Sequence, residues 1–159
     1  MSKHGDGARI RLNLVESHIL EQLFGELQAA LDSDAPTADD AVRARLYPAA
    51  YEDPDDARAF RELTESSLSA ERDERIEQSV AELRAGRTLR RTEVTVDADG
   101  AERWMKVLND LRLTFGTQLG ISEDEDNNTL DESDPQVHLR ARYLWLTALQ
   151  DALVTTVMG

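Results

Sequence analysis

Apolar residues fall on nearly every side of the helix that the sequence predicts for residues 135–158. On a helical wheel, one side carries Val137, Ala141, Leu144, Ala148 and Ala152, the next carries Trp145 and Leu149, and the opposite side carries Leu139, Leu146, Leu153 and Val157. Such a helix cannot turn a broad side to water, so it belongs in the middle of a helical domain or in an oligomer interface, which leaves a homodimer open. We expect it to be the most buried element, with Leu146, Leu149 and Leu153 in the core.

The chain before this helix predicts more helices with apolar positions at spacings of three and four. Residues 15–31 form one such helix, and a short one over 39–46 ends before Pro48. The pattern over 54–85, with Asp53 as its N-cap, changes face partway. Its polar stretch 69–75 indicates a bend or a solvent-crossing segment.

A further helix over 101–119 has Trp104, Leu108, Leu111 and Phe115 on one face and Leu113 on the opposite one. This helix therefore contacts two layers of the domain. Gly116 and Gly120 mark its end.

Two short segments alternate apolar and polar residues with the period of a strand, namely 9–14 (R-I-R-L-N-L) and 92–97 (T-E-V-T-V-D). A lone two-stranded ribbon is marginal in water, so we expect the two segments to pair with each other and lie on the helices. No other strand is predicted, and Gly5-Asp6-Gly7 is assigned to a mobile terminus. The expected fold is mainly α: one α-rich domain over 1–159, with a central C-terminal helix and one small two-stranded β-ribbon.

The stretch 122–135 is predicted to be an acidic, flexible loop inside this domain. Residues 123–134 hold seven carboxylates and no basic residue. Asp124, Asp126 and Asn128 match the first positions of a calcium-binding loop, but Thr129 replaces the required glycine and Pro135 the final glutamate. The sequence therefore predicts a connector and no metal site.

Composition narrows the classes of function. The 159 residues include no cysteine, which excludes disulfides, thiolate metal sites and a thiol switch. The net charge of −14 weighs against general attraction to nucleic acid or anionic lipid. No signal peptide or membrane span is evident, so we expect a cytoplasmic protein without a membrane partner.

One basic cluster stands out, formed by Arg84, Arg87, Arg90 and Arg91 with no acid among them. It is a candidate partner-binding site. It could also grip nucleic-acid phosphates, although no aromatic residue is interleaved to stack on bases. The alternative structural explanation is that these cations offset a helix dipole or neutralise the acidic loop.

A second group of polar residues lies on otherwise apolar helix faces and forms a candidate buried polar network: Asn109, Asp110, Arg112, Arg142 and Gln150. A partly buried arginine needs an acceptor, so we expect Arg112 to pair with an acid from another helix. Structural pairing is the favoured interpretation, and a ligand site is the alternative.

Catalytic motifs are absent from the sequence. His4, His18 and His138 have no metal-binding spacing, and neither a nucleophile elbow nor a glycine-rich phosphate loop is present. We therefore expect no enzymatic activity, no cofactor and no metal, with a small enzyme of unrecognised type as an alternative.

Several sequence blocks together resemble a known family: R-L-Y-P at 45–48, F-R-E-L-T at 60–64, Trp104 with L-N-D-L-R-L at 108–113, and Y-L-W-L at 143–146. The chain resembles the actinobacterial domain-of-unknown-function family two-thousand-seventeen, some members of which are called actinomycetes oxidative stress regulators. The resemblance implies a mostly helical cytoplasmic domain, and for the regulators a cysteine-dependent response coupled to a sigma-factor partner. Without cysteine, this chain cannot carry the redox switch over, so only the partner-binding half of that role remains open.

Taken together, these observations predict a regulatory or adaptor protein that acts through protein contacts, linked by the resemblance to stress response or transcription. The alternative is a nucleic-acid-binding regulator that uses the cluster from Arg84 to Arg91.

Overall fold

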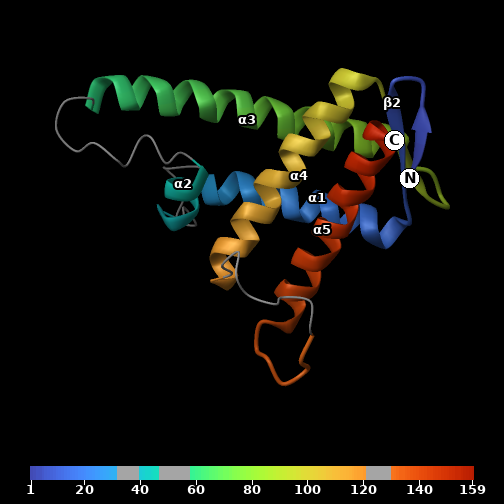
Figure 1. Ribbon diagram of the computed structural model, residues 1–159. Coiled ribbons are helices and arrows are strands. Elements are labelled where there is room, and N and C mark those ends of the chain that lie inside the picture. Colours follow the sequence, from blue (N-terminus) through green and yellow to red (C-terminus); the bar gives the residue numbers. More distant parts are fainter. Residues whose placement is uncertain (32–39, 47–57, 121–129) are drawn as a thin grey trace.

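Five helices and three strands make up the described part of the chain, and they confirm the expected mainly α fold (Figure 1). The computed structural model describes residues 1–31, 40–46, 58–120 and 130–159. The helices are α1 (Leu14–Leu31), α2 (Asp40–Leu46), α3 (Arg58–Gly86), α4 (Ala98–Leu119) and α5 (Val137–Met158). The strands are β1 (Ser2–His4), β2 (Gly7–Leu12) and β3 (Thr92–Val96).

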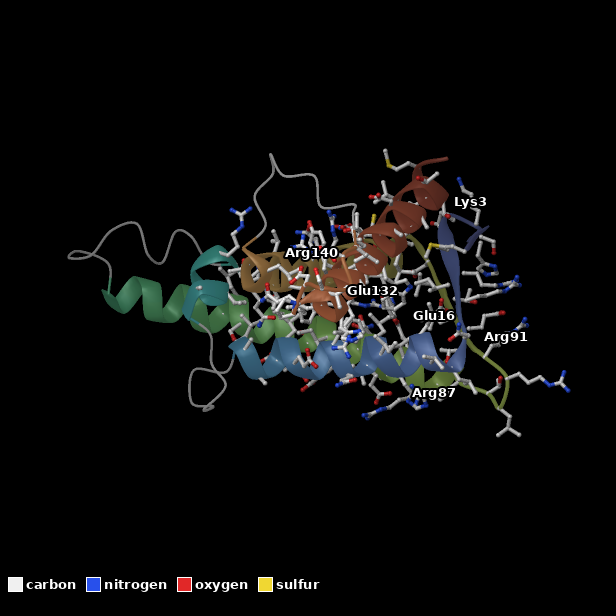
Figure 2. The ribbon with its side chains drawn as sticks, turned by 90° about the horizontal axis from the view of Figure 1, so that it is seen from below. Lys3, Glu16, Arg87, Arg91, Glu132 and Arg140 are labelled. Atoms are coloured by element: carbon white, nitrogen blue, oxygen red, sulfur yellow. The ribbon has the colours of Figure 1, made fainter. Side chains whose placement is uncertain are left out.

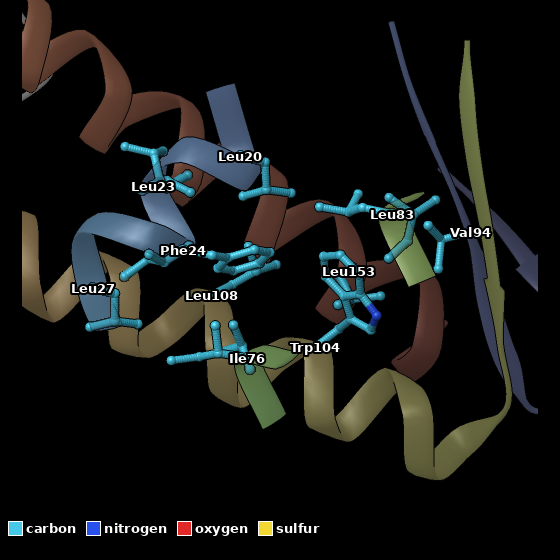
Figure 3. Packing of buried hydrophobic residues seen from close by; sticks show 14 of the residues in the cluster. Leu20, Leu23, Phe24, Leu27, Ile76, Leu83, Val94, Trp104, Leu108 and Leu153 are labelled. Atoms are coloured by element: carbon cyan, nitrogen blue, oxygen red, sulfur yellow. The ribbon is translucent and has the colours of Figure 1, made fainter. Parts of the chain in front are cut away.

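Helix α4 lies at the centre and contacts the other four helices as well as β2 and β3. It begins where the Asp97 side chain accepts a hydrogen bond from the Gly100 N–H at 2.8 Å, a typical N-cap. It ends at Gly120, whose φ of 68° is left-handed and favours glycine. Trp104 is fully buried and meets Phe24 of α1 edge to face, with ring centroids 6.0 Å apart (Figure 3).

The expectation that the last helix is the most buried element is wrong. Only Leu146 and Leu153 of α5 are buried, whereas α4 has ten buried residues, and Leu149 is half-buried against the core. Helix α5 packs on α4, β1 and β2. The wheel showed that α5 avoids water on many sides, but α4 buries Trp104, Leu108, Leu111 and Phe115 on one continuous face and so takes the centre.

The predicted pairing of the two strand segments is confirmed, because β2 and β3 are antiparallel with Ile10 opposite Val94. The predicted number of strands is wrong, because β1 adds a third strand in the order β1-β2-β3. Gly5, with φ of 58°, turns the chain between β1 and β2, so Gly5-Asp6-Gly7 belongs to a hairpin and not to a mobile terminus. All residues of β1 are exposed, and strand alternation therefore gave no signal for it.

The remaining helices lie close to their predicted ranges. Helix α3 runs without a break through the polar stretch 69–75, in which Arg72 and Arg75 are half-buried. It ends at Gly86, where a Cβ atom would lie 2.1 Å from the carbonyl oxygen of Glu93, so glycine is needed for α3 to approach β3. The proposed N-cap Asp53 lies outside the described residues.

The different burial of two leucines on α5 yields a stability prediction. Leu153→Ala removes a fully buried side chain and should lower the free energy of unfolding by about 2–5 kcal/mol. Leu149→Ala, at a half-buried position, should cost less than about 2 kcal/mol. Urea denaturation of both variants measures the difference. Equal costs would contradict the packing of α5 described above.

Candidate functional site

The outer face of the sheet carries arginines because β2 alternates strictly. Ala8, Ile10 and Leu12 point to the core, while Arg9 and Arg11 point outward. On the neighbouring strand, Glu93 lies opposite Arg11 in the strand register, so the two side chains meet on the same face.

Glu93 holds three guanidinium groups. Arg11 Nε donates to Glu93 Oε2 at 3.0 Å, Arg9 Nε lies 3.4 Å from Oε1, and Arg91 Nη2 lies 3.5 Å from Oε2. The hydrogen bond from Arg11, helped by the three positive charges, lowers the pKa of the Glu93 carboxyl. Arg9 also contacts His4 Nδ1 on β1 at 3.2 Å through Nη2. One carboxylate thus fixes three cations, and positive charge remains in excess.

A second carboxylate, Glu21 of α1, holds two more arginines at the end of α3. Arg84 Nε donates to Oε1 and Arg87 Nη2 to Oε2, each at 2.7 Å. The hydrogen bond from Arg87 is the main reason that the pKa of Glu21 is lowered, with Arg84 contributing. Arg87 also donates to Ser17 Oγ at 3.2 Å, and Ser17 in turn accepts from Thr92 on β3. These contacts tie α1, α3 and β3 together.

The chain between α3 and β3 forms an ordered tip that presents Leu89 and Arg90. Arg87 and Thr92 form an antiparallel bridge, and the Thr88 N–H donates to the Arg91 carbonyl at 2.8 Å. The Thr88 hydroxyl donates to the same carbonyl at 2.9 Å and accepts from the Arg91 N–H at 3.2 Å. Leu89 is 97% exposed. A leucine held this far out by a bonded turn is suited to contact another molecule.

We call this surface the arginine face, and it consists of Arg9, Arg11, Arg84, Arg87, Arg90 and Arg91. Five of its six guanidinium groups pair with Glu21 or Glu93, and Arg90 adds a sixth positive charge, in a chain whose net charge is −14. Figure 2 shows Lys3, Arg87 and Arg91 at the same end of the molecule, with Glu16 beside them. Guanidinium groups bind carboxylates and phosphates through paired hydrogen bonds, so this face suits an anionic surface.

The predicted cluster of four arginines is therefore only part of this surface. The sequence argument missed Arg9 and Arg11, although their alternation in β2 and the expected pairing with 92–97 would have placed them beside Arg91. The sequence suggested that the cluster neutralises the acidic loop. In the structure, Arg84 and Arg87 form ion pairs with Glu21 of α1.

The candidate polar network divides into separate contacts. Asp110 is buried between α4 and α3, where Arg72 Nε donates to Oδ2 at 3.1 Å and Arg75 Nη2 lies 3.8 Å away. Arg72 also donates to the Leu46 carbonyl of α2 at 3.3 Å. Burial raises the pKa of the Asp110 carboxyl, and the two arginines offset only part of that rise. This contact joins three helices.

Among the residues that the structure describes, Arg112 pairs with no acid from another helix, contrary to expectation. Its Nε donates to Thr147 Oγ1 at 3.1 Å, its Nη1 donates to the amide oxygen of Gln150, and its guanidinium lies 6.0 Å from the Tyr143 ring centroid. Gln150 also donates to the Met105 carbonyl at 3.2 Å. Neutral acceptors on α5 therefore satisfy this cation, which the charge pattern alone could not indicate.

The other two residues of the predicted network lie apart from it. Arg142 is near Glu26, with Nη1 3.8 Å from Oε1, and Asn109 is exposed. The five residues are not brought together into one site.

The described residues hold neither a cluster of metal-ligating side chains nor a membrane-spanning helix. Within them, no group of three or more histidine, aspartate or glutamate side chains is arranged to hold a metal ion. None of the described helices is long and apolar enough to cross a membrane. Asp124, Asp126 and Asn128 lie outside the described residues, as does much of the acidic stretch 122–135.

Comparison with known proteins agrees with the family resemblance drawn from the sequence. A family model described as "Domain of unknown function (DUF2017)" matches residues 1–157. No curated protein and no solved structure matches the chain.

The Glu21 contacts predict a pH-dependent stability. Because the folded pKa of Glu21 lies below its ordinary value of 4.5, its contribution is present above that pH and is lost as the pH falls through the folded pKa. Glu21→Gln should therefore cost about 1 kcal/mol at neutral pH and progressively less under acid conditions. Urea denaturation of both proteins across this range is the measurement. A cost that stays constant with pH would assign the effect to packing.

Proposed function

The chain belongs to the family described as "Domain of unknown function (DUF2017)", and we propose that it is a non-enzymatic regulatory or adaptor protein that binds an acidic surface of a partner protein through the arginine face. The observation that carries the proposal is the excess of positive charge on this face, where five arginines pair with the same two carboxylates and Arg90 lies beside them in the sequence. Acidic side chains of a partner would complete the ion pairs.

The tip of the α3–β3 turn favours a protein partner over nucleic acid. Leu89 is almost fully exposed beside Arg90 and Arg91, and an apolar side chain with neighbouring cations suits a protein pocket with an acidic rim. The net charge of −14 would repel a nucleic-acid backbone outside the contact itself.

The family resemblance supports a partner linked to transcription, such as a sigma factor, and a role in stress response. The chain has no cysteine, so any regulation of this contact would work without a thiol switch.

Arg90→Glu tests the proposal against a matched control, Lys106→Glu, which makes the same change in charge at an exposed position on α4. A partner is captured from lysate of the native host, produced in pure form and titrated with each protein by calorimetry. We expect Arg90→Glu to weaken binding at least about tenfold, and Lys106→Glu to leave it within about twofold, because only Arg90 lies in the contact.

A random-sequence DNA duplex at about 0.15 M salt serves as the nucleic-acid probe. We expect no tight binding to it. If Arg90→Glu and Lys106→Glu weaken binding equally, the affinity depends on the net charge of the protein and not on the arginine face, which would contradict the proposal. A tight DNA complex that Arg90→Glu abolishes would replace the adaptor proposal with the nucleic-acid-binding alternative.

A further inference from the structure

Helix α5 has a second apolar side that the described part of the chain does not cover. The sequence allowed two positions for a helix of this kind, the centre of the domain or an oligomer interface. The centre is occupied by α4. The partly buried apolar residues of α5 that pack against the core are Leu139, Tyr143, Trp145, Leu149 and Val157.

The outer side of α5 lies opposite Leu146 and Leu153 on the helical wheel, and its uncharged residues are Val137, Ala141, Leu144, Ala148 and Thr155. Each of these is exposed or half-buried. Two charged residues, Arg140 and Asp151, lie toward one edge of this side. In a chain with 31% charged residues, a largely apolar side with one positive and one negative charge along its edge calls for a partner.

We propose that this outer side is a homodimer interface, in which α5 packs antiparallel against α5 of a second copy about a two-fold axis near Leu146. Residues equally far from the axis then face each other. Leu144 of one copy lies against Ala148 of the other, and Val137 lies against Thr155. The large side chain meets a small one at both positions, and the alanines let the helices approach closely.

The flanking charges complement each other in the same arrangement. Arg140 and Asp151 are on the same flank at nearly equal distances on either side of Leu146, so the two-fold axis brings Arg140 of each copy beside Asp151 of the other. Two symmetric ion pairs result. Arg140 also has its Nε 3.4 Å from Asp134 Oδ2 in its own chain.

This self-complementarity is what selects a second copy as the occupant. A two-fold interface must match its own surface, and here large residues oppose small ones while positive charge opposes negative. The interface includes no residue of the arginine face, so the dimer would present two such faces.

Sedimentation velocity over concentrations from about 1 to 100 µM tests the dimer. The wild-type chain should sediment with twice the mass of one chain at the upper end of this range. Ala148→Glu places a carboxylate against Leu144 of the other copy and should give a monomer throughout. Ala81→Glu, the same substitution at an exposed position on α3, should leave the dimer unchanged. Circular dichroism checks that every variant folds.

A charge exchange tests the antiparallel arrangement. Asp151→Arg should raise the dimer dissociation constant about tenfold or more, because it sets two arginines side by side, and adding Arg140→Asp should restore dimerisation. A wild-type monomer at every concentration, or a dimer that survives Ala148→Glu, would overturn the proposal. If the wild-type chain is a monomer and its Ala148→Glu variant no longer binds a partner protein captured from lysate, then the outer side of α5 is the binding site of that partner. If Asp151→Arg weakens the dimer and adding Arg140→Asp does not restore it, the proposed antiparallel alignment of the two α5 helices is wrong.

Discussion

The burial of Trp104 is the constraint on which the arrangement of the helices depends. Its side chain is fully buried, so its indole N–H needs an acceptor within the protein, and the half-buried Glu82 of α3 supplies one at 2.6 Å. Glu82 is itself held by Arg103, the neighbour of Trp104 on α4. The ring packs on Phe24 of α1. One side chain therefore sets α1 and α3 relative to α4 by packing on one side and hydrogen bonding on the other.

The positions of the side chains in the arginine face depend on this core. With α1 and α3 fixed, Glu21 comes within reach of Arg84 and Arg87, and Thr92 donates to Ser17 at 2.9 Å from the first residue of β3. The sheet is thus attached to the helices by polar contacts as well as by its apolar inner face. A surface whose cations are already held in place loses little side-chain entropy when an anionic partner binds.

Periodicity predicted most of the elements, because a helix or strand with one buried face leaves its period in the sequence. It could not rank α4 against α5, since the wheel counts apolar positions and does not show how many other elements each helix contacts. Strand β1 was missed because none of its side chains is buried. For the candidate site, the run from Arg84 to Arg91 was visible along the chain. Arg9 and Arg11 lie beside this run only because β2 pairs with β3. Arg112 donates to two neutral acceptors that are 35 and 38 positions away in the sequence, which the local pattern cannot show.

The pairing of β2 with β3 also bears on how the chain folds during synthesis. Arg11 and Glu93, which are bonded across the two strands, are 82 positions apart. The β1–β2 hairpin leaves the ribosome before the rest of the sheet, and β2 contacts only β1 and α1 until β3 and α4 have been made. Closing so long a loop is entropically costly and belongs to a late step of folding. The surface proposed to bind a partner therefore does not exist on a nascent chain, and an incomplete chain that ends before β3 cannot compete for that partner.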